Sequence, residues 1–326
     1  MNLKMNNIEK VFELINNSQN ICISGHKSPD GDCIGSVMAL YRFLKRLGKS
    51  KNLTVCIEGT IPFNYRQYVD EDVIIKEYDN KKFDLLFILD CSDLERLGKF
   101  KDVYKNSKKS VCIDHHKTNK SYADINIIDS SMSSTGEILY DVFKALNVKI
   151  TKEEASLIYI AILTDTGKFS YSNTSSDTHR KAAELIDLGV QVAEIDNTIY
   201  NSKPSNIVKA FIDCVGGIEL YYGNRLGIAS ITKGVLEKNN ADMGDIDGVV
   251  EFIREIKEVE VSCVLKENEN KTRVSLRSKN NIDVSEVSVK FGGGGHAKAA
   301  GFEVNKDVKN TKELLINTFK EYFGEQ

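Results

Sequence analysis

The chain has 326 residues, of which 44 are Lys or Arg and 47 are Asp or Glu, giving a net charge of −3 at pH 7. This length exceeds what one hydrophobic core usually serves, so we expect two domains. The near-neutral charge argues against a protein that coats long duplex nucleic acid or a membrane surface.

The N-terminus and the cysteines indicate the compartment. The segment Met1–Asn17 lacks the apolar core of a signal peptide, and no stretch approaches the roughly 18 apolar residues that a spanning helix requires. Seven cysteines lie singly, with no Cys-x-x-Cys pair, which predicts buried thiols rather than disulfides or a zinc knuckle. We therefore expect a cytoplasmic protein without a membrane partner.

Short β-branched runs alternate with helical patterns from Ile21 onward. A helix is expected near Cys33–Leu47, after the run ICIS, and the runs LTVCIE, DLLFILD, SVCID and INIID follow. This alternation predicts an α/β domain with a parallel, doubly wound sheet. From about Ser134 the pattern becomes helical. We assign residues 1–195 to this first domain.

A second domain is expected after a polar linker, residues 196–215, which contains Pro204. The runs GIELYYG and RLGIASI flank Gly223-Asn224 and predict a hairpin, and VEVSCVLKE with KTRVSLRSK predicts another. Helical patterns near 246–256 and 311–323 complete a smaller α+β domain, residues 216–326.

Polar side chains gather where the strands of the first domain end. In open parallel sheets, ligands collect beyond the carboxyl ends of the strands. Five carboxylates at one sheet edge would repel one another, and bound cations remove that repulsion. Mixed imidazole and carboxylate ligands suit a divalent cation such as Mn²⁺. The residues concerned are His26, Asp30, Asp32, Asp90, Asp114, His115, His116 and Asp165.

A second polar feature lies near the C-terminus. Four consecutive glycines precede the helix-prone run HAKAA, which predicts a loop that leads into a helix N-terminus, where free N–H groups favour an anion. His296 would lie at its edge. Shortly upstream, Arg277, Ser278 and Lys279 end a predicted strand, and an arginine fork is a common partner of phosphate.

Together these motifs resemble those of the DHH phosphoesterases. HKSPDGD, the strand-terminal Asp90, DHH at Asp114–His116 and TDTG at Thr164–Gly167 are similar to the four motifs of that family. RSK and GGGGH are similar to its DHHA1 domain. The resemblance runs from about Ile21 to about Gly301 and is greatest to the stand-alone nanoRNases that also act on pAp.

The resemblance implies two Mn²⁺ ions per active site, with Mg²⁺ or Co²⁺ as substitutes. His26, Asp30 and Asp90 would hold one ion. Asp32, Asp90, His115 and Asp165 would hold the other, so that Asp90 bridges. His116 would face the substrate phosphate or the leaving oxygen, with Asp114 orienting a neighbouring imidazole. The implied substrate-binding residues are Arg277, Ser278, Lys279, Gly293, Gly294, Gly295 and His296.

The expected activity is Mn²⁺-dependent hydrolysis of short oligoribonucleotides to mononucleotides, and of pAp to AMP. Two alternatives remain open: a phosphodiesterase for cyclic di-AMP or its linear product pApA, and a catalytically silent nucleotide sensor. A family II pyrophosphatase is not expected to carry the glycine tetrad with His296, and a RecJ-type exonuclease would require a larger basic groove. The oligomeric state, including a homodimer, stays open.

Overall fold

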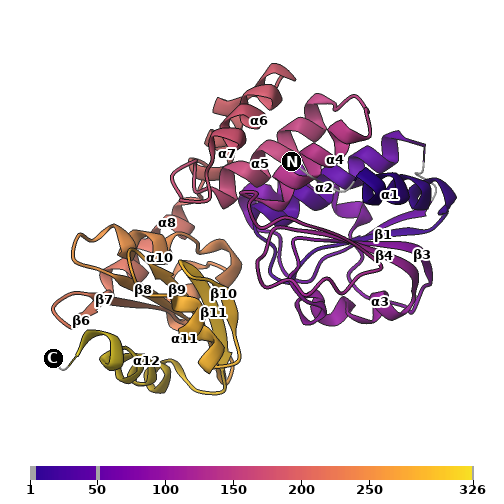
Figure 1. Ribbon diagram of the computed structural model, residues 1–326. Helices are drawn as coiled ribbons and strands as arrows, with labels where there is room; N and C mark the ends of the chain where they lie inside the picture. Colours follow the sequence, from indigo (N-terminus) through magenta and orange to yellow (C-terminus); the bar gives the residue numbers. More distant parts are fainter. Residues whose placement is uncertain (1–4, 49–51, 325–326) are drawn as a thin grey trace. The chain divides into compact units, whose positions relative to one another are not determined.

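The computed structural model describes residues 5–48 and 52–324. The chain divides into two compact units, Met1–Ser202 and Lys203–Gln326 (Figure 1). The predicted linker covers the end of helix α7 (Val192–Tyr200) and most of helix α8 (Ser205–Gly216). Within the described ranges, no helix is both long and apolar enough to cross a membrane.

The first unit contains a parallel five-stranded sheet in the order β2-β1-β3-β4-β5. Its strands are short and mostly apolar, and the three inner strands are largely buried, because both faces of the sheet are covered. This arrangement confirms the predicted α/β class. The strands are β1 (Ile21–Ser24), β2 (Leu53–Cys56), β3 (Phe83–Leu89), β4 (Ser107–Asp114) and β5 (Ile125–Ile128).

Helices cover both faces of this sheet (Figure 1). The larger hydrophobic core lies under α1, α2, α4 and α5, and a smaller core around Phe83, Phe100 and Val103 lies on the other face. The helices are α1 (Met5–Asn17), α2 (Gly31–Arg46), α3 (Asp102–Lys105), α4 (Thr135–Ala145), α5 (Lys152–Asp165), α6 (Ser176–Asp187) and α7. Short 3-10 helices span Phe63–Tyr68, Glu71–Val73 and Leu94–Phe100.

The second unit contains a six-stranded mixed sheet in the order β10-β11-β9-β8-β7-β6. The antiparallel pairs β6–β7 and β8–β9 confirm the two predicted hairpins. The strands are β6 (Glu219–Tyr221), β7 (Leu226–Ile231), β8 (Val261–Asn268), β9 (Lys271–Ser278), β10 (Gly294–His296) and β11 (Ala299–Val304). The helices are α8, α9 (Lys233–Asn239), α10 (Val249–Glu255), α11 (Val284–Lys290) and α12 (Val308–Phe323), with a 3-10 turn at Met243–Asp245.

The helix predicted after the glycine tetrad is wrong. His296 ends β10 and Ala299 begins β11, and the two strands form an antiparallel hairpin whose second strand also pairs with β9. A Cβ on Gly293 would lie 2.2 Å from the carbonyl oxygen of Gly301. Gly295 has φ 141°, and a Cβ there would lie 2.5 Å from the carbonyl oxygen of Ala299. These glycines therefore permit close strand pairing, which overrides the local helix propensity.

Candidate active site

The six residues predicted to bind metal all belong to the first unit, and so do Asp114 and His116, which were predicted to act beside them. They follow the carboxyl ends of β1, β3 and β4, begin α2 or end α5. The chain runs from β1 outward to β2 and then returns to β3 on the other side of β1. Ligands in open α/β sheets bind where the strand order reverses in this way.

His26 faces two carboxylates. Its Nε2 lies 3.3 Å from Oδ2 of Asp90 and 3.6 Å from Oδ2 of Asp30. Its Nδ1 lies 3.0 Å from the backbone oxygen of Lys27, which can only accept, so Nδ1 carries a proton and donates a hydrogen bond to that oxygen. Burial alone would lower the pKa of His26, but the charges of Asp30 and Asp90 outweigh burial and raise the pKa to about 10. The surroundings of Nε2 therefore stabilise a positive charge.

Asp90 is the carboxylate that the other polar groups share. It is buried, and its Oδ1 accepts a hydrogen bond from Oγ1 of Thr135 at 3.2 Å. Burial raises its pKa, yet the hydrogen bond from His26 and the charges of the histidines hold the pKa well below the usual range. Its φ of 53° is left-handed. Such strain costs about 1–3 kcal/mol and clusters at functional sites.

Asp32 lies under the N-terminus of α4. It accepts hydrogen bonds from the backbone N–H groups of Thr135 at 2.7 Å and Gly136 at 3.0 Å, and from Ser36. Burial and the nearby charges of Asp90 and Asp165 raise the pKa of Asp32 well above its usual value. A cation beside these carboxylates would offset that repulsion.

His115 contacts three carboxylates through one ring nitrogen. Its Nε2 lies 3.8 Å from Asp32, 3.7 Å from Asp90 and 3.6 Å from Asp165. Its Nδ1 lies 3.4 Å from the backbone oxygen of Met132. Metal-binding histidines usually donate one N–H in this way and turn the other nitrogen to the ion. His26 shows the same arrangement.

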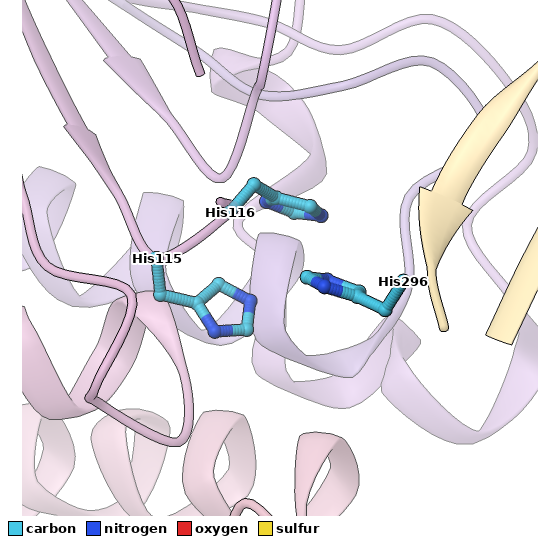
Figure 2. Close-up of side chains that lie close together, drawn as sticks. All are labelled: His115, His116 and His296. Atoms are coloured by element: carbon cyan, nitrogen blue, oxygen red, sulfur yellow. The ribbon is translucent and has the colours of Figure 1, made fainter. Parts of the chain in front are cut away.

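His116 is oriented by Asp114. Its Nδ1 donates to Oδ1 of Asp114 at 2.6 Å, and the other oxygen of Asp114 accepts from Asn119 at 2.7 Å. Figure 2 shows the rings of His115 and His116 at the end of β4. The ring centroids lie 4.8 Å apart in an edge-on arrangement.

The donor set fits divalent cations. Ligating atoms of Asp32, Asp90 and His115 lie within 4.8 Å of one another, and so do those of His26, Cys33 and Asp90. Carboxylate and imidazole donors suit Mn²⁺ or Mg²⁺. The thiol of Cys33 does not fit, because burial raises its pKa well above the usual value and a thiol must ionise to bind a metal.

Two predicted substrate-binding residues share one face of the second sheet. Ala299 pairs with His296 on one side and with Arg277 on the other. Directly paired residues project to the same face of a sheet. Nε of Arg277 lies 3.0 Å from Oε1 of Glu251 on α10. His296, also drawn in Figure 2, belongs to β10.

The other residues predicted to bind substrate do not project to that face in the same way. Ser278 follows Arg277 in β9, so its side chain projects to the opposite face, where it is buried. Nζ of Lys279 donates to the backbone oxygen of Ile256 at 2.7 Å, just after α10. Gly293 lies just before β10, and Gly294 and Gly295 are within it.

Several contacts at the site were not predicted from the sequence. The backbone N–H groups of Thr135 and Gly136 donate to Asp32. The side chain of Asn119 donates to Asp114, and that of Asn173 donates to the backbone oxygen of Asp165 at 3.0 Å. No motif marks these residues, because each acts through the packing of α4 or of a loop.

Comparison with known proteins identifies the family. The model of the DHH family, N-terminal domain, matches residues 20–162, and that of the DHHA1 domain matches residues 227–325. The chain is 30% identical over 303 residues to the bifunctional oligoribonuclease and PAP phosphatase NrnA of Thermus thermophilus, covering 92% of this chain and 89% of that protein. A protein of the same name from Bacillus subtilis is 29% identical over 293 residues, covering 87% of this chain and 89% of that protein.

Solved structures agree with this assignment. An exopolyphosphatase-related protein from Bacteroides fragilis is 25% identical, with a TM-score of 0.88 and full coverage (100%) of both chains. RecJ of Thermus thermophilus, solved in complex with Mn²⁺, shares the fold at a TM-score of 0.54 and 14% identity, over 98% of this chain and 54% of RecJ. The chain belongs to the DHH family of metal-dependent hydrolases and carries a DHHA1 domain after its DHH domain.

Proposed function

We propose that this protein hydrolyses short oligoribonucleotides to mononucleotides and removes the 3′-phosphate of pAp. The observation that carries the proposal is the buried Asp90, which contributes to three groups of candidate ligating atoms at the switch point of the sheet. The substrate class is supported by the names of the two relatives that match nearly the whole chain.

We propose Mn²⁺ as the metal, with Mg²⁺ or Co²⁺ as substitutes, and two ions per site. His26, Asp30 and Asp90 would hold one ion, and Asp32, Asp90, His115 and Asp165 the other. Nε2 of both histidines faces carboxylates while Nδ1 faces a backbone oxygen, which supports this assignment. When bound, such a pair of ions lowers the pKa of water and stabilises negative charge that develops on phosphate oxygens.

His116 is the residue that we assign to the substrate phosphate or the leaving oxygen. Asp114 accepts a hydrogen bond from Nδ1, which fixes the tautomer and leaves Nε2 as the atom that exchanges a proton with substrate. Burial of Asp114 keeps water from competing for this hydrogen bond.

We assign catalysis to residues 1–195 and substrate recognition to the DHHA1 domain, residues 216–326. Residues 196–215 would link the two. Arg277 and His296, with only the small side chain of Ala299 between them in this register of the sheet, offer an anchor for a phosphate and a surface for a nucleotide. We give Ser278, Lys279, Gly293, Gly294 and Gly295 the role of shaping this surface.

Hydrolysis assays on a substrate panel test the proposal. The purified protein is offered 5′-labelled RNA from a dinucleotide to about 20 nucleotides, pAp, pApA, cyclic di-AMP and pyrophosphate. Each is assayed with Mn²⁺, Mg²⁺, Co²⁺ or a chelator. We expect hydrolysis of the shortest RNA and of pAp with metal, slower hydrolysis of long RNA, and none with chelator.

Other outcomes would replace the proposal. Faster hydrolysis of cyclic di-AMP or pApA than of other dinucleotides and pAp would favour a signalling phosphodiesterase. No hydrolysis of any substrate with any metal would favour a nucleotide sensor.

A further inference from the structure

A buried ion pair joins α6 to α4, whose N-terminus contacts Asp32. Nζ of Lys181 lies 3.1 Å from Oε1 of Glu137 and 2.7 Å from Oδ2 of Asp141. Lys181 is 5% exposed and Glu137 is 1% exposed. Taking charges out of water costs several kcal/mol per ion, so an ion pair this deep is a weak source of stability.

The second oxygen of Glu137 is bound by residues outside the ion pair. Oε2 accepts hydrogen bonds from the backbone N–H of Ser133 at 2.9 Å, from the Ser133 hydroxyl at 2.6 Å and from Thr178 at 3.1 Å. One carboxylate thus links the charge on α6 to the residues around the start of α4. We call residues 132–136, which include the first two residues of α4, the 132–136 segment.

The 132–136 segment in turn holds two predicted metal ligands. The backbone oxygen of Met132 lies 3.4 Å from Nδ1 of His115. The backbone N–H groups of Thr135 and Gly136 donate to the two oxygens of Asp32 at 2.7 and 3.0 Å. A shift of this segment would therefore move the contacts that orient both ligands.

A separate contact fixes the same segment from the loop after α5. Nδ2 of Asn173 donates to the backbone oxygen of Ser133 at 2.9 Å and to that of Asp165 at 3.0 Å. The segment is thus held by Asn173 as well as by Glu137, and the Glu137 contact depends on a buried charge.

We propose that Glu137 and Lys181 are positioning residues that set the affinity of the site for divalent cations. Lys181 neutralises Glu137, Glu137 fixes the 132–136 segment, and the segment orients Asp32 and His115. This inference rests on the proposed function, because it concerns the metal that the same site would hold. Changes in groups that orient metal ligands typically cost about 10- to 100-fold in metal affinity or activity.

Metal binding by the full chain without substrate is the test. Mn²⁺ is titrated calorimetrically into metal-free wild-type protein and into Lys181→Met, Glu137→Gln and Arg180→Met. Arg180 is the matched control, because it neighbours Lys181, pairs with Asp177 as Lys181 does, and is 68% exposed. We expect about 10- to 100-fold weaker binding in the first two variants and wild-type binding in the third.

Kinetics separate positioning from a general loss of structure. At saturating Mn²⁺, Lys181→Met and Glu137→Gln should regain most of kcat, and KM for a dinucleotide should stay near that of the wild type. Wild-type Mn²⁺ affinity in either variant, with only a lower free energy of unfolding, would overturn the inference.

Two further outcomes are distinguishable. If Lys181→Met does not fold, Ser133→Ala removes only one hydrogen bond to Glu137 and should still weaken Mn²⁺ binding; unchanged affinity there overturns the inference. If the wild-type protein binds no divalent cation, the proposed function fails, and the inference fails with it.

Discussion

Nδ1 of His116 lies 2.6 Å from Oδ1 of Asp114, a carboxylate that is fully buried. An ionised carboxylate only accepts hydrogen bonds, so the proton stays on Nδ1 of His116. The amide of an asparagine at position 114 could instead donate to that nitrogen and favour the other tautomer.

Asp114→Asn should therefore lower kcat while leaving metal binding intact. We expect a fall of about 10- to 100-fold, with KM for a dinucleotide changed far less. Steady-state kinetics and elemental analysis measure the two effects. A kcat within about twofold of the wild type would show that the orientation of His116 does not limit turnover.

The second prediction concerns Asp90, the carboxylate that three groups of candidate ligating atoms share. Asp90→Asn should remove activity on every substrate and reduce bound metal, because His26 and His115 both contact Asp90. Asp102→Asn is the control, since that carboxylate is 64% exposed and forms an ion pair with Lys105 on the surface of α3. Retention of about a tenth of wild-type turnover with unchanged metal content would contradict the bridging role of Asp90.

The clustering of the proposed site residues was predictable because of where they stand in the chain. His26, Asp90 and Asp114 end or follow buried strands, and parallel strands bring their carboxyl ends to one edge of a sheet. Lys181 could not be predicted in the same way. A lysine in an amphipathic helix is usually exposed, and its burial depends on α4, about 40 residues earlier in the chain.

The hairpin at the glycine tetrad could not be predicted from the local sequence either. HAKAA has the composition of a helix, but the register of β11 against β9 places Ala299 opposite Arg277. Pairing between distant strands decided the conformation, and local propensity is a weak guide in such cases.

The third prediction concerns stability at low pH. Asp84 accepts hydrogen bonds from Lys108 at 2.8 Å and from the backbone N–H groups of Asn20 at 3.0 Å and Gln19 at 3.1 Å. The hydrogen bond from Lys108, followed by those from the two backbone groups, holds the pKa of Asp84 well below its usual range. A carboxylate with a lowered pKa stabilises the fold above its unfolded pKa, about 3.9, and stops doing so as the pH falls through its folded pKa.

Asp84→Asn should accordingly lower the free energy of unfolding by about 1 kcal/mol at pH 7. The difference from the wild type should shrink as the pH falls below about 4. Urea denaturation of both proteins across this range measures it. A difference that stays constant down to about pH 3 would mean that the charge of Asp84 contributes nothing to stability.

The last prediction separates chemistry from recognition. Loss of one charge-assisted hydrogen bond to a phosphate costs roughly 1.5–3 kcal/mol, or about 10- to 100-fold in kcat/KM. Arg277→Ala should cause such a loss on a dinucleotide and on pAp. It should hardly affect bis-p-nitrophenyl phosphate, a small activated ester without a second anchor, provided that the wild type hydrolyses it. Asp32→Ala should abolish hydrolysis of all three.

A control on the same strand makes this comparison specific. Lys271 lies at the other end of β9, is 50% exposed and pairs with Glu303 at 3.0 Å, so Lys271→Ala removes a positive charge from β9 at a distance from Arg277. It should leave all three rates near those of the wild type. If Arg277→Ala instead slows the activated ester as much as the dinucleotide, then the pairing of Arg277 with Glu251 supports the fold of the DHHA1 domain and the phosphate anchor must lie elsewhere.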